Sequence, residues 1–171
     1  MNYCEFAALQ DENNVHRIYH DLHYGTPLTN DNELFGRLIL EINQAGLSWS
    51  TILNKEANFR AAFDHFDIEK IAEYDQEKFD ELMNNAGIIR NRLKINAVIH
   101  NAQQVIEIQK EFGTFKHWLD QHGELTKLEW VKIFKKRFKF VGGEIVNEFL
   151  MSLNYLPGAH HPGCFRYIEY K

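Results

Sequence analysis

The chain has 171 residues, carries a net charge of −5 with histidine neutral, and is 44% apolar. This length suits a single domain that buries enough apolar surface to fold alone, and the charge argues against a protein that coats nucleic acid through bulk attraction. No apolar run of about eighteen residues exists, so we expect no membrane span. The first residues lack the basic start and apolar stretch of a secretory signal, and we therefore expect a cytoplasmic protein.

Helical periodicity dominates the chain, and no pair of alternating strands with a hairpin turn is present. The residues expected to cap helices at their N-termini are Asp31, Ser48, Asp67, Asp75 and Thr114. The first of these helices is expected to end near Gly46. Further helices are predicted over residues 92–112, 114–123, 128–138 and 143–154. The predicted class is therefore all-α, with residues 1–15 and 155–171 irregular.

A very short turn joins two predicted helices within residues 84–95, NNAGIIRNRLKI. Gly87 marks a position where positive φ is expected. Backbone amides of such a turn, followed by Arg90, Arg92 and Lys94 at a helix start, would suit a phosphate. The alternative is an ordinary helix–turn–helix packing unit with solvated basic side chains.

Cysteines and histidines stand near both ends of the chain. Cys4 lies near the start and His20 follows it, whereas His160 and Cys164 form an H-x3-C pair near the end. Closed structural zinc sites use thiolate and imidazole ligands, so these four residues are candidates for a site that joins the two ends. His161 is a further available ligand. The alternative is scattered histidines and buried free thiols, because a split site without C-x2-C is a weak signal.

The segment 40–52, LEINQAGLSWSTI, is the most unusual of the chain. Glu41 falls on the apolar face of a predicted helix or at its border, where a carboxylate either pairs with another group or has a function. Trp49 follows the break at Gly46 and is either a pocket wall that stacks on a flat ring or a core residue. A stretch dense in histidine and tyrosine lies upstream, at residues 16–24.

Residues 132–143, KIFKKRFKFVGG, interleave basic and aromatic side chains. This pattern would suit the phosphates of a nucleic acid backbone. It equally fits an amphipathic helix whose aromatic side packs in the core while its lysines face water.

In combination, these segments resemble the DNA-3-methyladenine glycosylase I family of the helix–hairpin–helix glycosylase superfamily. Members carry an N-terminal cysteine, then Y-H-D-x-x-W-G, E-x-x-Q-A-G-L-S-W, A-G-I-I-R-x-R-x-K-I, F-K-F-V-G and a C-terminal H-x3-C. The matching positions, in the same order, are Cys4, Tyr19 to Asp21, Glu41, Gln44 to Trp49, Ala86 to Ile95, Phe138 to Gly142, His160 and Cys164. The matches cover nearly the whole chain, and the second and third internal motifs are specific.

The resemblance implies an all-α, helix–hairpin–helix DNA glycosylase fold in one domain of residues 1–171. It assigns one structural zinc ion per chain to four ligands, Cys4, His20, His160 and Cys164. In this arrangement the zinc joins the two termini, 1–15 and 155–171, and has no open position for water.

The resemblance also implies an enzyme of DNA base-excision repair, a monofunctional N-glycosylase that hydrolyses the N-glycosidic bond of 3-methyladenine. Its partners would be alkylated double-stranded DNA and the free base, and we expect a monomer. The implied catalytic residues are Glu41 and Tyr19. The implied base-binding residues are Trp49, Glu41, His16 and Tyr24. The implied contacts to the DNA backbone are Gly87, Arg90, Arg92 and Lys94.

Five positions depart from the family pattern near the implied pocket. His16 replaces a tyrosine, His23 a glutamate, Tyr24 a tryptophan, Ile42 a glycine and Asn43 a glutamine. Ile42 would narrow the site, and His16 would change its charge with pH. These departures keep open an alternative, a catalytically impaired, zinc-stabilised module of the same fold that binds DNA or a purine. A catalytic zinc hydrolase is disfavoured, because four protein ligands close a zinc site.

Overall fold

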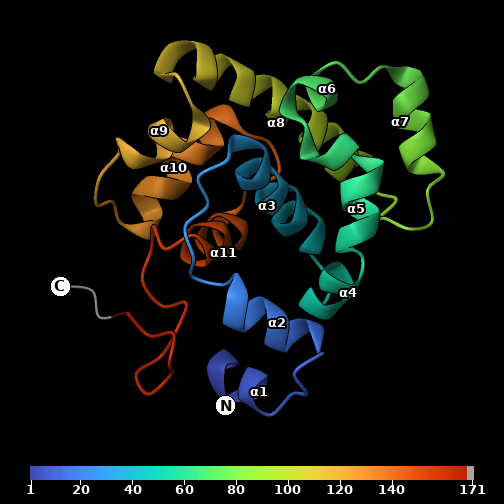
Figure 1. The fold of residues 1–171 in the computed structure, drawn as a ribbon. Helices are drawn as coiled ribbons and strands as arrows, with labels where there is room; N and C mark the ends of the chain where they lie inside the picture. The colour runs from blue at the N-terminus through green and yellow to red at the C-terminus, as the bar shows by residue number, and fades with distance from the viewer. Residues whose placement is uncertain (169–171) are drawn as a thin grey trace.

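The computed structural model describes residues 1–168, and within that range every regular element is a helix (Figure 1). The elements are α1 Tyr3–Ala8, α2 Val15–Leu22, α3 Asp31–Gln44, α4 Trp49–Asn54, α5 Glu56–Ala62, the 3-10 turn η1 Asp64–Phe66, α6 Ile68–Ala72, α7 Gln76–Met83, α8 Arg92–Phe112, α9 Phe115–Asp120, α10 Lys127–Arg137 and α11 Gly143–Ser152. The predicted all-α class is confirmed. No helix of the described range is both long and apolar enough to cross a membrane.

Most predicted helix boundaries hold to within two residues. The side chains of Ser48, Asp67, Asp75 and Thr114 accept hydrogen bonds from backbone N–H groups at the starts of α4, α6, α7 and α9. The longest predicted helix, residues 92–112, is α8, which ends at Gly113 with φ of +91°. Polar caps and glycine stops therefore delimit these helices as the sequence suggests.

Asp31 has a different role from the predicted one. Asn30 is the N-cap of α3, and its side chain accepts from the Glu33 N–H. The Asp31 carboxylate instead accepts from the backbone N–H groups of Phe115 at 2.9 Å and Lys116 at 3.0 Å. Asp31 therefore joins the start of α3 to the first turn of α9, a tertiary role that local spacing does not reveal.

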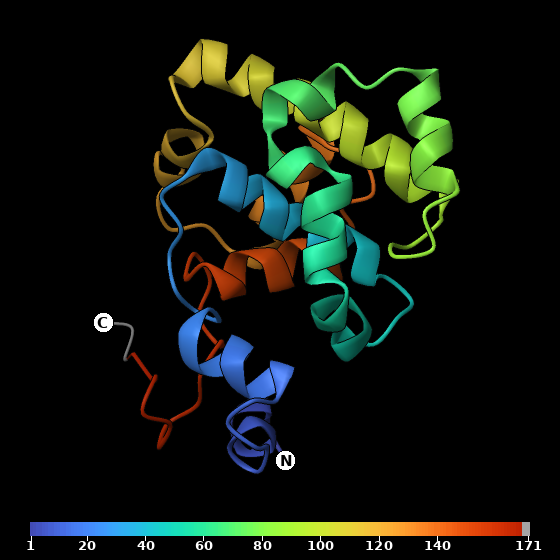
Figure 2. The same cartoon turned by 45° about the vertical axis from the view of Figure 1, so that its right-hand side comes forward.

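The core surrounds α3, which runs through the middle of the molecule (Figures 1 and 2) and packs against α4, α8, α9 and α11. Its inward face consists of Leu34, Phe35, Leu38, Ile39 and Ile42, all fully buried. Burying each such side chain contributes about 1.5 to 3 kcal/mol. A rigid, deeply buried α3 is therefore the scaffold on which Glu41 is carried.

A close approach explains one glycine in α3. A Cβ on Gly36 would lie 2.2 Å from Cδ2 of Phe66, so the ring occupies the space of the missing side chain. Phe66 ends a turn in which Asp64, His65 and Phe66 all have positive φ, a conformation costly for residues with a Cβ. The Tyr74 hydroxyl donates a hydrogen bond to the Asp64 carboxylate and helps to hold this turn.

The N-terminal segment is not irregular, contrary to the prediction for residues 1–15. The Asn2 side chain accepts from the Glu5 N–H while the Glu5 carboxylate accepts from the Asn2 N–H, and this capping box starts α1. Ala7 of α1 is fully buried. The C-terminal segment from residue 155 to 168 contains only turns and bends, as predicted.

Candidate functional site

A pocket of about 750 Å³ opens between the N-terminal helices, α3, the start of α4 and the start of α11. Its lining residues are Tyr3, Tyr19, Tyr24, Glu41, Gln44, Ala45, Gly46, Trp49, Gly142, Gly143, Glu144, Ile145 and Glu148. Apolar and aromatic surface with a few polar groups is the usual make-up of a small-molecule site. Four of the residues predicted to act on a base, Tyr19, Tyr24, Glu41 and Trp49, lie together in this wall.

Glu41 supplies a buried carboxylate to the pocket. Its side chain is 3% exposed, and among the described residues no group donates a hydrogen bond to it. Burial and, to a smaller extent, the charge of Glu148 raise the pKa of Glu41 to about 8, although Arg37 opposes both effects. A buried carboxylate without a donor is costly in a folded chain, so Glu41 fits a ligand that brings donors or positive charge.

Aromatic side chains form the wall beside Glu41. Trp49 begins α4 directly after the Ser48 cap, and its ring meets that of Tyr19 edge-on at 5.3 Å between centroids. The ring centroids of Tyr19, on α2, and Tyr24, just after the end of α2, lie 5.5 Å apart. Burial raises the pKa of both tyrosines, so their hydroxyls stay neutral. Trp49 also packs on the core, so both interpretations of this residue hold in part.

His16 is not part of the pocket wall, contrary to the prediction that it binds the base. Its Nδ1 lies 3.1 Å from the Tyr3 hydroxyl, and Tyr3 is the residue that lines the pocket. Burial lowers the pKa of His16, which favours the neutral ring. His16 therefore contacts the hydroxyl of Tyr3 but does not itself line the pocket.

Tyr3 and Glu148 are among the pocket residues that escaped the sequence prediction. Tyr3 lies on α1, a helix that was not expected, and Glu148 lies on α11 one turn after Ile145. An isolated glutamate on an amphipathic helix resembles any solvated surface residue. The spacing of Glu144, Ile145 and Glu148, which share one helix face, is the only sequence signal for it.

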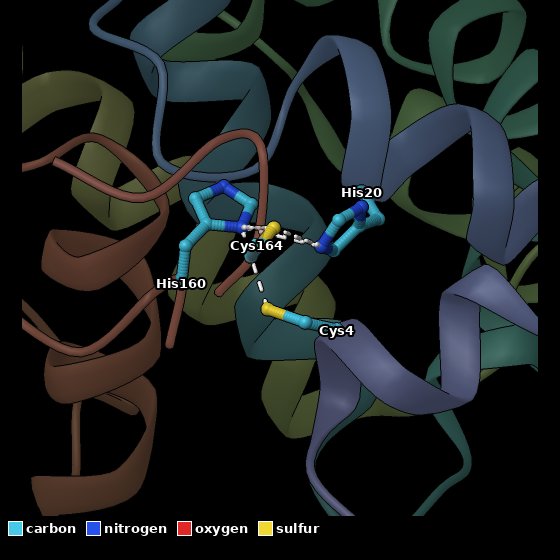
Figure 3. A group of neighbouring side chains, drawn as sticks. All are labelled: Cys4, His20, His160 and Cys164. Carbon is cyan, nitrogen blue, oxygen red and sulfur yellow. Dashed lines mark hydrogen bonds between the residues drawn. The ribbon is translucent and has the colours of Figure 1, made fainter. Parts of the chain in front are cut away.

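The second polar cluster lies behind α2, where four side chains from distant parts of the chain converge (Figure 3). Cys4 comes from α1, His20 from α2, and His160 and Cys164 from the C-terminal segment. His20 Nε2 lies 3.2 Å from His160 Nδ1 and 3.6 Å from Cys164 Sγ. His160 Nδ1 lies 3.7 Å from Cys4 Sγ and 3.8 Å from Cys164 Sγ.

These separations match the edges of a tetrahedral zinc site. Zn–S bonds of about 2.3 Å and Zn–N bonds of about 2.0 Å place ligand atoms about 3.3 to 3.8 Å apart. The opposite ring nitrogens are also held: His20 Nδ1 lies 2.7 Å from the Asp21 carboxylate, and His160 Nε2 lies 2.7 Å from the Tyr24 carbonyl. Both partners only accept, so these nitrogens donate and the other two present lone pairs to the cluster.

Local geometry favours His160 over its neighbour. Gly25 has φ of +73°, and a Cβ there would lie 2.9 Å from His160 Cδ2, so glycine lets the imidazole approach the end of α2. His161 is exposed and does not belong to the cluster. The described cysteines are free thiols rather than a disulfide.

Comparisons with known proteins identify this combination of fold and pocket. A family model described as methyladenine glycosylase matches residues 9–135, well over half of the chain. The chain belongs to the methyladenine glycosylase family. DNA-3-methyladenine glycosylase 1 of Escherichia coli is 36% identical over 87% of this chain and 89% of its own length. The Haemophilus influenzae DNA-3-methyladenine glycosylase is 39% identical over 83% and 87%.

Solved structures agree with this assignment. A structure of 3-methyladenine DNA glycosylase I is 33% identical, covers 94% of this chain and 98% of its own, and superposes with a TM-score of 0.82. The Staphylococcus aureus 3-methyladenine DNA glycosylase I, described as the structural basis of 3-methyladenine recognition, is 28% identical and covers 99% and 100%, with a TM-score of 0.86.

In this methyladenine glycosylase family member, the turn between α7 and α8 differs from the prediction at Gly87. The φ of Gly87 is not positive; instead, a Cβ would lie 3.0 Å from Asn85 Oδ1 and 3.2 Å from Asn58 Nδ2. The Gly87 N–H donates to Asn85, and its carbonyl accepts from Asn58. Of the basic residues here, Arg90 and Arg92 are exposed.

Lys94 does not reach the surface and does not fit its predicted contact with the DNA backbone. It is 4% exposed, and its ammonium group donates to the carbonyls of Asn43 at 2.8 Å and Ala45 at 2.7 Å. These carbonyls end α3 without intrahelical partners, and a cation there also suits the helix dipole. Lys94 therefore closes the end of the helix that carries Glu41.

The basic stretch 132–143 has the amphipathic arrangement that its sequence allowed, and its contact with phosphates stays a prediction. Phe134 and Phe138 are buried in the core, whereas Phe140 is exposed, and Lys132, Lys135 and Lys136 are exposed on α10. Two of the three aromatic residues therefore build the core, and the lysines leave a basic outer face.

Proposed function

We propose that this protein excises 3-methyladenine from alkylated double-stranded DNA by hydrolysing the N-glycosidic bond, as a monofunctional enzyme of base-excision repair. The observation that carries the proposal is the donor-free carboxylate of Glu41 at the wall of an aromatic pocket. Membership of the family and the recognition of 3-methyladenine by the Staphylococcus aureus relative support the same substrate.

The pocket would recognise a base that has left the DNA stack, which costs a few kcal/mol of lost stacking and pairing. Trp49, Tyr19 and Tyr24 would contact its faces and edges, and Glu41 would accept hydrogen bonds from it. Methylation at N3 makes the base cationic, so it leaves without protonation. The N–C1′ bond breaks with its electron pair moving to the base, water adds its oxygen to C1′, and the proton passes to solvent. We propose that Glu41 and Tyr19 orient the base for this step.

The zinc site is the second part of the proposal. Cys4, His20, His160 and Cys164 would hold one Zn²⁺ per chain, which their separations and the partners of both imidazoles support. The ion would supply a structural cross-link with no open position for water. It would fix the end of α2, because His160 is bonded to the Tyr24 carbonyl while the Tyr24 side chain lines the pocket.

DNA would bind at the turn between α7 and α8, in the manner of a helix–hairpin–helix unit. Arg90 and Arg92 are exposed at this turn, with the Arg92 guanidinium over the Phe79 ring, and the exposed lysines of α10 offer further positive charge. We propose that these groups and the backbone near Gly87 contact phosphates, which would offset the net charge of −5 locally. A cytoplasmic monomer stays a prediction.

The test is release of free bases from methylated duplex DNA. The proposal predicts 3-methyladenine release by folded protein and little release of normal purines. A folded, zinc-containing protein that binds 3-methyladenine without releasing it from DNA would support the alternative instead, a binding module of the same fold. The observation that favours this alternative is the replacement of a family tryptophan by Tyr24 in the pocket wall.

A further inference from the structure

The pocket contains a second, half-buried carboxylate that the mechanism above does not use. Glu148 lies on α11 and lines the same cavity as Glu41, which comes from α3. The charge of Glu148 acts on Glu41 and on all three pocket tyrosines, Tyr3, Tyr19 and Tyr24. Its carboxylate is therefore central to the electrostatics of the cavity.

No cation forms an ion pair with Glu148 within the described part of the chain. The charge of Lys127 acts on Glu148, but its ammonium group pairs with Glu144 at 3.4 Å. Arg37, whose charge acts on Glu41, lies over the Tyr19 ring, 5.4 Å from its centroid. The pocket thus holds more negative than positive charge.

Tyr24 lies in the same pocket wall as Glu148. Burial and the charge of Glu144 raise the pKa of Glu148, whereas the Tyr24 hydroxyl and the charge of Lys127 oppose this rise. A tyrosine hydroxyl can donate a hydrogen bond to a carboxylate, and the tryptophan expected at this position lacks that hydroxyl. The departure at Tyr24 is therefore paired with Glu148, and both face the cavity.

We propose that Glu148 is a specificity-determining residue that selects the cationic, methylated base of the substrate over uncharged purines. This inference rests on the proposed function. Two carboxylates close together in one pocket are unfavourable, and a cation bound between them removes that cost. A neutral purine of the same shape would not.

The charge of the base changes during the reaction, so its attraction to Glu148 differs between substrate and product. The base is positively charged while it is attached to the sugar, and it becomes neutral when the N–C1′ bond breaks and the electron pair moves to the ring. Glu148 therefore attracts the substrate base and loses that attraction to the product. We expect it to act on KM and not on kcat, since its interaction with the base is greatest before cleavage.

Glu148→Gln tests this directly, because the amide keeps the size of the side chain and its oxygen still accepts from Tyr24. The probes are 3,9-dimethyladeninium, a fixed cation, and 3-methyladenine at mildly alkaline pH, where it is uncharged. We expect the variant to bind the cation about tenfold more weakly, from the loss of one charge at contact distance. Binding of 3-methyladenine should change by less than about twofold, because no charge pair is lost.

Three controls make the result decisive. Glu124→Gln removes the same charge from an exposed loop residue and should change neither affinity. Glu148→Asp keeps the charge and should retain the selectivity for the cation, which also covers the case in which the glutamine variant does not fold. An equal loss of affinity for both probes, or an unchanged ratio in Glu148→Gln, would overturn the inference.

The same preparations separate this inference from the proposed function. If the wild-type protein releases no 3-methyladenine from DNA, the proposed function fails whatever the binding ratio. If it releases the base and Glu148→Gln lowers kcat with KM unchanged, the proposed function stands and the role assigned to Glu148 is wrong.

Discussion

The two polar clusters on either side of α2 differ in how their groups are satisfied. In the cluster proposed to bind a metal, His20 and His160 each have a polar partner for the ring nitrogen that faces away from the cluster. In the pocket, Glu41 is just as deeply buried but receives no hydrogen bond from any described group. Adjacent residues of one helix serve the two sites, since Tyr19 lines the pocket and His20 faces the cysteines.

This difference separates a site built for stability from one built for a ligand. Groups that satisfy one another lower the energy of the folded chain and rigidify it. An unsatisfied buried carboxylate costs stability and is retained where a ligand supplies the missing partner. Changes in the pocket should therefore affect activity and leave stability intact, whereas changes in the metal cluster should do the reverse.

The largest effect is expected for Glu41→Gln. The amide cannot accept hydrogen bonds at both positions or balance a cation, so kcat/KM for 3-methyladenine release should fall by at least about 100-fold, as for other preorganised polar groups. The melting temperature should be equal or higher, because the substitution replaces a buried carboxyl group that no described residue satisfies. Base release and thermal unfolding of the same preparation measure both. A large drop in melting temperature would contradict the distinction between the two sites.

Removal of the metal should have the next largest effect, and on the opposite property. Cys164→Ser should reduce the zinc content from about one per chain to near zero, since a closed site needs all four ligands. The loss of the cross-link should lower the melting temperature by about 10 °C or more. Metal analysis and calorimetry measure these changes. His161→Ala is the matched control, because the exposed His161 lies outside the cluster and its loss should change neither quantity.

Substitution of Lys94 should lower stability, whereas substitution of Arg90 should weaken DNA binding. Lys94→Met leaves two carbonyls at the end of α3 without a donor, so the free energy of unfolding should fall by about 2 kcal/mol.

Arg90→Ala should leave the melting temperature unchanged. It should weaken duplex binding several-fold and reduce the salt dependence by about one phosphate contact. Unchanged stability and weakened duplex binding in Lys94→Met would instead support the predicted contact of Lys94 with the DNA backbone.

The last expected effect, which requires no substitution, is a pH dependence of cation binding. The pKa of Glu41 in the empty pocket is raised to about 8, so its carboxyl group is largely protonated and neutral below that pH. A cation prefers the ionised form, so affinity for 3,9-dimethyladeninium should rise with pH, by up to about tenfold over two units, and level off above about 8. Titration calorimetry measures this rise. Glu41→Gln should flatten it, and a rise that persists in this variant would assign it to another group.

Local signals in the sequence predicted most of the fold. Caps such as Ser48, Asp67 and Asp75 act through the backbone N–H groups that immediately follow them, so spacing alone locates them. Helix α1 was missed because its six residues are too few for a periodic pattern and its capping box follows directly on the first residue. Asp31 was predicted as the N-cap of α3, whereas its carboxylate binds the start of α9, and sequence spacing could not reveal this because those backbone partners are more than eighty residues away.

The residues of the candidate site were also predictable where a local motif contains them, and not where tertiary packing places them. Glu41 and Trp49 belong to a contiguous motif, so the sequence identified them before the pocket was seen. Lys94 belongs to an equally specific motif, but the burial of its ammonium group depends on how α8 meets the end of α3. Glu148 belongs to no motif, and only the packing of α11 against α3 makes it part of the pocket.

The measurement that tests the central claim most directly compares Glu41→Gln and Cys164→Ser in one assay. Release of 3-methyladenine from methylated duplex DNA is measured per folded molecule, at a temperature low enough for both variants to be folded. The account predicts that Glu41→Gln retains zinc and loses release, whereas Cys164→Ser loses zinc and retains most of its release. Release that disappears with the metal and survives in Glu41→Gln would place the chemistry at the metal cluster and contradict the account.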